Sequence, residues 1–108
     1  MATKTVTTVS NVLAANTLSK LHTVTGGTWA LASLRLTNDG AAAAISAYIG
    51  AGNAPEGRHR IIATNTPLGA GGSYSDTNLL LAANESLWVR TTGANVAVRA
   101  VVIEEEQE

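Results

Sequence analysis

The residues of this chain that could take part in acid–base or metal chemistry are few and scattered. His22 falls in a short run that we predict to be a strand, and His59 stands between Arg58 and Arg60. Positive charge on both sides of His59 disfavours a bound metal cation and gives this histidine no nucleophile to activate. Catalysis needs ionisable groups placed together so that each tunes the other. We therefore expect no catalytic residue, no metal ligand and no cofactor site, and predict that the protein is not an enzyme.

Two other features superficially resemble sites. Asp39 and Asp76 are single carboxylates in segments predicted as turns, where aspartate commonly hydrogen-bonds its own backbone. The segment Gly69–Gly72 has the glycine content of a phosphate-binding loop, but no Lys-Ser or Lys-Thr pair follows it and no helix is expected there to hold an anion. Both features are better explained by turn geometry than by ligand binding.

Two charged clusters stand out because the rest of the chain is nearly neutral. One is basic, at residues 58–60, and the other is the acidic end of the chain, at residues 104–108. An acidic end is commonly a solvated tail that prevents edge pairing of strands. The alternative is that the acidic residues of one copy, or of a partner, meet the basic cluster of another copy through charge-assisted hydrogen bonds. The candidate interface residues are Arg58, His59, Arg60, Glu104, Glu105 and Glu106.

The composition of the chain limits the kinds of partner that we expect it to bind. Charged residues make up 14% of the 108 residues, against about a quarter in ordinary soluble proteins, while the apolar fraction is 45%. A net charge of −1 offers no excess positive charge to hold a phosphate backbone, so nucleic acid is not an expected partner. The chain has no cysteine, no apolar signal segment at its start and no apolar run long enough for a membrane span. We expect a soluble product, made in the cytoplasm of the cell that produces it, with no membrane partner.

The elements that must position these residues are strands. Apolar residues alternate with polar ones between turn signals, most clearly in 96–102. Ala41–Ala44 alone would suit a helix, but the alternation that follows it favours a strand. In the segment 29–37, Leu34 and Leu36 face one side, whereas Trp29 and Leu31 are out of phase with them and suggest a bulge or burial on both sides. The predicted strands are 4–13, 17–24, 29–37, 41–49, 58–64, 87–92 and 96–102, with a brief pairing at 73–75.

Turn signals at this short spacing are typical of an all-β protein, and no segment has the 3.6-residue periodicity of a crossover helix. The sequence predicts a single antiparallel β-sandwich of seven or eight strands, either a jelly roll or immunoglobulin-like. Its domain covers residues 1–103, with residues 1–8 as an alternative extended arm, and residues 104–108 form the acidic C-terminal tail.

Four aromatic residues leave one binding function open. A carbohydrate or host-surface binding module would require Trp29, Trp88, Tyr48 and Tyr74 to gather on one exposed face. Their scatter over different predicted strands favours core or rim packing instead.

A sequence resemblance adds a biological context. The order of Leu34–Asn38, Ile45–Ile49, Arg60–Ile62, Leu79–Arg90 and Val96–Ala100 resembles that in small β-sandwich virion proteins of tailed bacteriophages. The resemblance covers about the last two-thirds of the chain. Such proteins usually have glycine in the turn where this chain has Asn84, and either residue can adopt the backbone conformation required there.

The resemblance implies a structural role without an active site. The expected function is capsid decoration or stabilisation in the virion, as a homo-oligomer that contacts the major capsid protein or other virion proteins. The alternative is an accessory protein of the tail or of the head–tail region. A sparsely charged sandwich suits extensive protein contacts of either kind.

Overall fold

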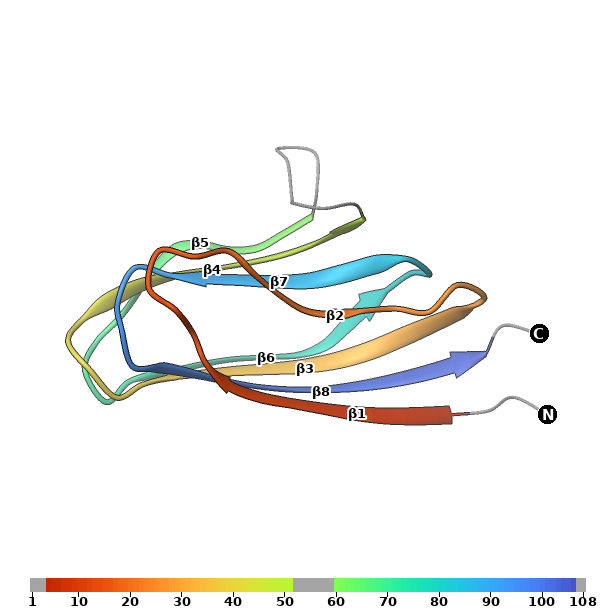
Figure 1. Cartoon of the computed structure of the whole chain (residues 1–108), viewed down its shortest axis with the longest axis horizontal. Helices are drawn as coiled ribbons and strands as arrows, with labels where there is room; N and C mark the ends of the chain where they lie inside the picture. The colour runs from red at the N-terminus through yellow and green to blue at the C-terminus, as the bar shows by residue number, and fades with distance from the viewer. Residues whose placement is uncertain (1–3, 52–59, 107–108) are drawn as a thin grey trace.

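The chain folds into eight strands arranged as two four-stranded antiparallel sheets, which confirms the predicted sandwich (Figure 1). The computed structural model describes residues 4–51 and 60–106, with the side chains of residues 60–64 left out of the description. The strands are β1 (Lys4–Val12), β2 (Ser19–Thr23), β3 (Thr28–Asn38), β4 (Ala43–Ala51), β5 (Arg60–Leu68), β6 (Ser73–Leu81), β7 (Glu85–Thr91) and β8 (Val96–Glu106).

The strand order is that of a jelly roll. One sheet has the order β1-β8-β3-β6 and the other β2-β7-β4-β5, and we call them the β8 sheet and the β7 sheet. Strands β1, β2, β3 and β4 pair antiparallel with β8, β7, β6 and β5 respectively, as if one long hairpin had been rolled up. The further pairs β3–β8 and β4–β7 join these strand pairs into the two four-stranded sheets. This topology decides between the two predicted architectures in favour of the jelly roll.

The two sheets enclose one apolar core. In β3 and β8 the inward side chains are buried at every second position, as the pleat requires. Figure 1 shows the β8 sheet as one layer and the β7 sheet as the other, with β8 ending at the same end of the sandwich at which β1 begins. The buried apolar residues are Leu13, Val24, Ala30, Ala32, Leu34, Leu36, Ile45, Ala47, Ile49, Leu68, Leu81, Leu87, Trp88, Val89, Val96, Val98, Ala100 and Val102.

Strand β3 explains the apolar residues that were out of phase. Leu34 and Leu36 are buried, while Trp29 and Leu31 lie on the opposite, outer face of the same regular strand. The register between β3 and β6 does shift between Ala32 and Leu34, but the extra residue belongs to β6, so the bulge suggested for the segment 29–37 is not found in β3. Trp29 and Leu31 therefore belong to the molecular surface and not to the core between the sheets.

Strands β5 and β6 are both longer than predicted. Strand β5 continues through Pro67 to Leu68, and β6 is a full strand from Ser73 to Leu81, although glycines and Asp76 favoured loops there. Proline is tolerated because β5 is the edge strand of its sheet. In β6, Asn78 adopts a φ of 58°, which accommodates the register shift opposite β3.

The predicted boundaries at the two chain ends need correction. Strand β8 runs to Glu106, so residues 104–106 belong to the sheet, and residues 107–108 lie outside the described residues. Residues 4–8 pair with β8 as part of β1, so over these residues the strand prediction is confirmed and the alternative of an extended arm is wrong. The tail prediction was wrong because the run of like charges was taken to be solvated, whereas the alternation of inward and outward side chains along β8 continues through that run.

Asparagine side chains shape several turns. Asn84 has a φ of 68°, the left-handed conformation that we predicted for it, and Asn95 has a φ of 63° in the turn before β8. Asn84 precedes β7 directly, so the turn between β6 and β7 is short.

Asn38, the last residue of β3, is completely buried and ties two turns together. Its Nδ2 donates to the carbonyl oxygens of Ala41, at 2.8 Å, and Leu68, at 2.9 Å. Its Oδ1 accepts the N–H of Gly40 at 2.9 Å. The backbone of Asn38 also pairs with residues 71–72. The side-chain amide therefore joins the β3–β4 connection to the end of β5, and the backbone of the same residue joins both to the β5–β6 turn.

Candidate functional site

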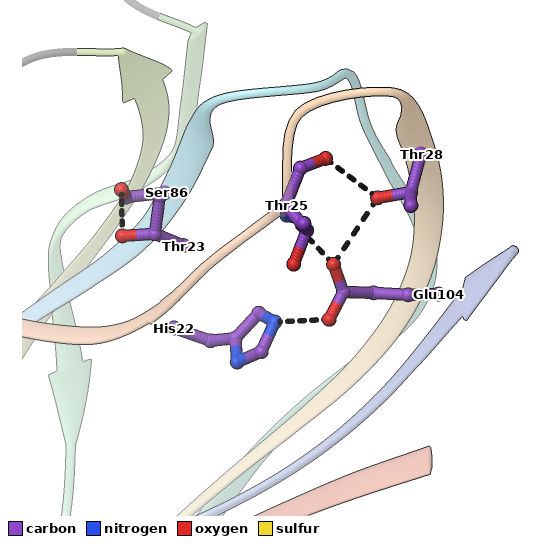
Figure 2. Close-up of polar contacts among 6 residues, drawn as sticks. All are labelled: His22, Thr23, Thr25, Thr28, Ser86 and Glu104. Carbon is purple, nitrogen blue, oxygen red and sulfur yellow. Dashed lines mark hydrogen bonds and ion pairs between the residues drawn. The ribbon is translucent and has the colours of Figure 1, made fainter. Parts of the chain in front are cut away.

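At the other end of β3, the carboxylate of Glu104 is buried in a polar cluster (Figure 2). We call Glu104, His22, Thr25 and Thr28 the Glu104 cluster. Oε1 of Glu104 accepts the backbone N–H of Thr25 at 2.7 Å and lies 3.2 Å from Oγ1 of Thr28. Oε2 lies 3.1 Å from Nε2 of His22, and Glu104 is only 7% exposed. Because His22 is in β2 and Glu104 in β8, the cluster bridges the two sheets.

The cluster favours the ionised form of Glu104. Burial by itself raises the pKa of this carboxyl group, but hydrogen bonds from Thr25, His22 and Thr28 outweigh that effect and leave the pKa below its ordinary value. An imidazole that carries its proton on Nε2 donates to the carboxylate without being charged itself. The arrangement therefore compensates the buried negative charge.

The Glu104 cluster has the parts of a carboxylate–histidine pair but lacks the third part of a catalytic site. In a nucleophilic triad the second ring nitrogen of the histidine faces a hydroxyl or thiol. No described side chain hydrogen-bonds Nδ1 of His22, and the hydroxyl of Thr28 lies on the carboxylate side, 2.7 Å from the carbonyl oxygen of Thr25. The contacts hold the β2–β3 turn against β8, which is a structural role.

The outer face of the β8 sheet carries an exposed apolar row. Strand registers align Val6 with Ile103, Ile103 with Leu31, and Leu31 with Leu80, so one residue from each of the four strands lies in a single line across the sheet. Their exposed fractions are 63%, 41%, 37% and 52% for Val6, Ile103, Leu31 and Leu80. We call this line the apolar row. Contiguous exposed apolar side chains of this kind mark interaction surfaces.

Two arginines lie next to each other on the same face. Arg35 of β3 and Arg99 of β8 are paired in register, flanked by Ser75 of β6 and Ser10 of β1, and we call this line the arginine row. Like charges directly opposite each other on neighbouring strands are destabilising. Neither arginine has an acidic partner among residues 4–51 and 60–106. Both line an open depression of about 650 Å³, with Ser10 and Thr37 among its other lining residues.

The remaining outer residues of this sheet complete the pattern. On the other side of the apolar row from the arginine row, Lys4, Glu105 and Trp29 are aligned, and we call them the glutamate row. Between the apolar and arginine rows lie the smaller Thr8, Val101 and Ser33, which we call the middle row. The face therefore has a basic end, an apolar centre and a far end at which a glutamate lies between a lysine and a tryptophan.

The predicted interface residues are only partly placed by the structure. Arg58 and His59 lie outside the described residues, and Arg60 begins β5 opposite Ile49, with its side chain not described. Whether the basic cluster meets the acidic one stays a prediction.

The acidic half of that interface is corrected at one position. Glu104 points inward and is held by the Glu104 cluster, so it is not available to another copy. Glu105 lies on the outer face, half-buried, and Glu106 is exposed at the end of β8. An alternating strand necessarily turns the middle of three consecutive glutamates to the opposite side of the sheet from the other two.

The single polar residues singled out in the sequence behave differently from one another. His22 lies in a strand, as predicted, and is partly buried against Glu104. Asp76 lies within β6, not in a turn, and its Oδ2 accepts the hydroxyl of Tyr74 at 3.4 Å. In the turn after β3, it is the buried Asn38 rather than the exposed Asp39 that bonds the turn backbone.

The four aromatic residues do not gather on one face. Trp29 lies on the outer face of the β8 sheet, and Tyr74 packs against the core from β6. Tyr48 and Trp88 are paired in register on the outer side of the β7 sheet, where Nζ of Lys20 lies 5.7 Å from the centre of the Trp88 ring. Trp88 is itself buried, and its Nε1 has no hydrogen-bond partner among the described residues. The condition set for a carbohydrate platform is therefore not met.

Sequence reasoning missed the arginine row and the apolar row. Arg35 and Arg99 are far apart in sequence, and only the β3–β8 register brings them together. A signal for the apolar row was present, because Leu31 was out of phase with the core residues of its strand. Pairing it with Ile103 required the topology.

The described parts of the chain contain no candidate metal cluster and no candidate membrane-spanning helix. No group of three or more His, Cys, Asp or Glu side chains in them could hold a metal ion. Within the same residues, no helix has the length and apolar character needed to cross a membrane. In comparisons with known proteins, no family model, curated protein or solved structure matches this chain.

Proposed function

We propose that this chain is a non-enzymatic structural protein of a bacteriophage virion, which decorates or stabilises the capsid through protein–protein contacts. The observation that carries the proposal is the exposed apolar row across all four strands of the β8 sheet. Such a row is unfavourable in water and becomes favourable when another protein covers it.

The fold supports the same role by analogy. Jelly rolls with two four-stranded sheets are common in viral capsid domains, and they are also found in lectins and cupins. Fold alone does not specify function, so the surface must discriminate between these possibilities. Sugar stacking in a lectin would require the aromatic residues to lie on one face, whereas here they are divided between faces. A cupin would require a metal site, and no described cluster could hold a metal ion.

The Glu104 cluster, which most resembles an active site, is better explained as part of the structural framework. All contacts of Glu104 join strands or a turn of this same chain, and its carboxylate is buried behind them. A buried carboxylate that serves the fold of its own chain, together with apolar side chains that face outward in a row, suits the role of a building block.

Location in the particle tests this proposal. Particles released by cells that carry the gene would be purified on a density gradient and labelled with gold-conjugated antibodies raised against the purified chain. We expect regular labelling of the heads in electron micrographs, and preimmune serum provides the control. Labelling confined to tails would replace capsid decoration by a tail function, and particles devoid of the chain would overturn the virion role.

A further inference from the structure

Along β3 and β8, the outer face of the β8 sheet carries an apolar centre between two arginines at one end and Trp29 and Glu105 at the other, with Lys4 of β1 beside Glu105. Along these two strands the pattern is complementary to itself. Along β8 the outward residues run from Arg99 through Val101 and Ile103 to Glu105. On β3 the outward residues at the same levels run from Arg35 through Ser33 and Leu31 to Trp29. A second copy in the opposite strand direction would present the reverse order.

We infer that this face binds the same face of a second copy of the chain, with the two β8 strands antiparallel. The two-fold axis would lie between the sheets and run across the strands, midway between Val101 and Ile103. Each Arg99 then lies opposite Glu105 of the other copy, and each Arg35 opposite Trp29 of the other copy. Such pairs allow a charge-assisted hydrogen bond and a cation–π contact.

The charges select this orientation over the other face-to-face arrangement. A two-fold axis along the strands would place each arginine row against the arginine row of the other copy. Four guanidinium groups would then face one another, in addition to the pairing of Arg35 with Arg99 that already exists within one chain. The antiparallel arrangement instead gives both arginines of each copy an electron-rich partner.

Side-chain size fits the same arrangement. About the proposed axis, the apolar row of one copy falls on the middle row of the other, so Leu31 meets the smaller Ser33 and Ile103 meets the smaller Val101, while Val6 meets Thr8 of equal size. Packing large side chains against small ones is what allows two surfaces to interdigitate at interior density. Two sheets stacked in this way would keep their strands within about 30° of each other, a range that long arginine side chains can bridge.

The area is sufficient for a weak but specific dimer. Four strands spaced about 4.8 Å apart, overlapping over about nine residues of about 3.3 Å each, cover about 600 Å² of each copy. The total of about 1,200 Å² is at the lower limit of specific interfaces. We therefore expect a dimer that dissociates on dilution.

Sedimentation velocity over a range of concentrations tests this inference. The chain has a mass of 11.0 kDa, and we expect a shift to twice that mass as the concentration is raised to about 500 μM. Arg99→Glu should weaken the dimer at least about tenfold, because it places like charges opposite each other. The double variant Arg99→Glu/Glu105→Arg should return the dissociation constant to near the wild-type value.

A matched pair of surface variants locates the interface. Leu31→Asp, in the apolar row, should abolish dimers, whereas Val12→Asp should leave them intact. Val12 is 60% exposed on the same face, but it pairs with Ala97 and lies beyond the region that the second copy covers. Circular dichroism of each variant checks that its strands are retained.

Three results would overturn the inference. They are a chain that stays monomeric over the whole concentration range, a dimer that is insensitive to Arg99→Glu, and a dimer that Val12→Asp breaks as readily as Leu31→Asp does. A chain that stays monomeric would indicate a different protein as the partner of the outer face of the β8 sheet. The inference concerns the purified chain and does not rest on the virion role, but a dimer would cover the apolar row and leave contacts with the capsid to its other faces.

Discussion

The two ends of strand β3 both bury a polar side chain, but in different ways. At one end Asn38, a neutral amide, satisfies its donors and acceptor with backbone groups of the connecting turns. Beside the other end Glu104, a carboxylate from β8, accepts hydrogen bonds from Thr25, Thr28 and His22. The amide is held by groups that do not titrate. The carboxylate depends on its own ionisation, so only this end of the sandwich should respond to acid.

The first prediction concerns the amide end. Asn38→Leu should lower the free energy of unfolding by about 3–4 kcal/mol, because it leaves the buried carbonyl of Leu68, and the part-buried carbonyl of Ala41 and N–H of Gly40, without their partner. Urea denaturation followed by tryptophan fluorescence measures the loss.

A neighbouring residue supplies the control for this experiment. Asp39 is exposed and its side chain makes no hydrogen bond or ion pair within the described residues, so Asp39→Ala should change the stability by less than about 0.5 kcal/mol. If Asn38→Leu were as mild as Asp39→Ala, the amide would not be what joins the turns.

The second prediction concerns the carboxylate end at neutral pH. Glu104→Ala should lower the free energy of unfolding by about 2 kcal/mol, because the N–H of Thr25 loses its acceptor and the β2–β3 turn loses its contact with β8. Glu106→Ala, two residues later in the same strand and exposed, is the matched control and should have little effect. Equal effects of the two substitutions would show that the burial of Glu104 does not matter for stability.

The sequence predicts the roles of the polar residues at the two ends of β3 to different extents. The turn after β3 was predicted from Asn38-Asp39-Gly40, but the role of Asn38 depends on the carbonyl of Leu68, thirty residues away, which no local pattern indicates. The alternation of β8 was evident from Val96 to Val102. The same period, extended by two residues, places Glu104 inside, and the acidic run concealed this because charged side chains are rarely buried.

For the fold as a whole, the all-β class followed from local patterns, whereas the pairing of strands did not. Short apolar runs between turn residues predict strands, but β1 pairs with β8 and β3 with both β6 and β8 across most of the chain. Those registers depend on how the two apolar faces meet. They also create the apolar and arginine rows, so the candidate surface could not be assembled without them.

The third prediction separates the two ends by pH. The pKa of Glu104 is lower in the folded chain than its ordinary value of about 4.3, so the folded state binds fewer protons in that range than the unfolded state. The stability that ionised Glu104 contributes is complete above that ordinary value and is lost as the pH falls through the lower folded-state value.

Denaturation measured between pH 7 and pH 3 checks this sign. Glu104→Gln should flatten the acid dependence relative to the wild type, since it removes the titrating group but keeps the shape of the side chain. Asn38→Leu should keep the wild-type dependence at lower overall stability. An unchanged acid slope in Glu104→Gln would assign that dependence to other carboxylates.

The smallest effect is expected at His22. Its Nε2 is the partner of Oε2 of Glu104 at 3.1 Å, whereas Oε1 keeps the contacts to Thr25 and Thr28 when the imidazole is removed. The side chain of His22 is 14% exposed, so water can reach the vacated oxygen, and His22→Ala should lower the unfolding free energy by about 0.5–1 kcal/mol. His22→Gln retains an N–H donor and should fall between the alanine variant and the wild type. A loss in His22→Ala as large as that in Glu104→Ala would mean that the link between the sheets, and not the turn held by Oε1, is what the buried carboxylate stabilises.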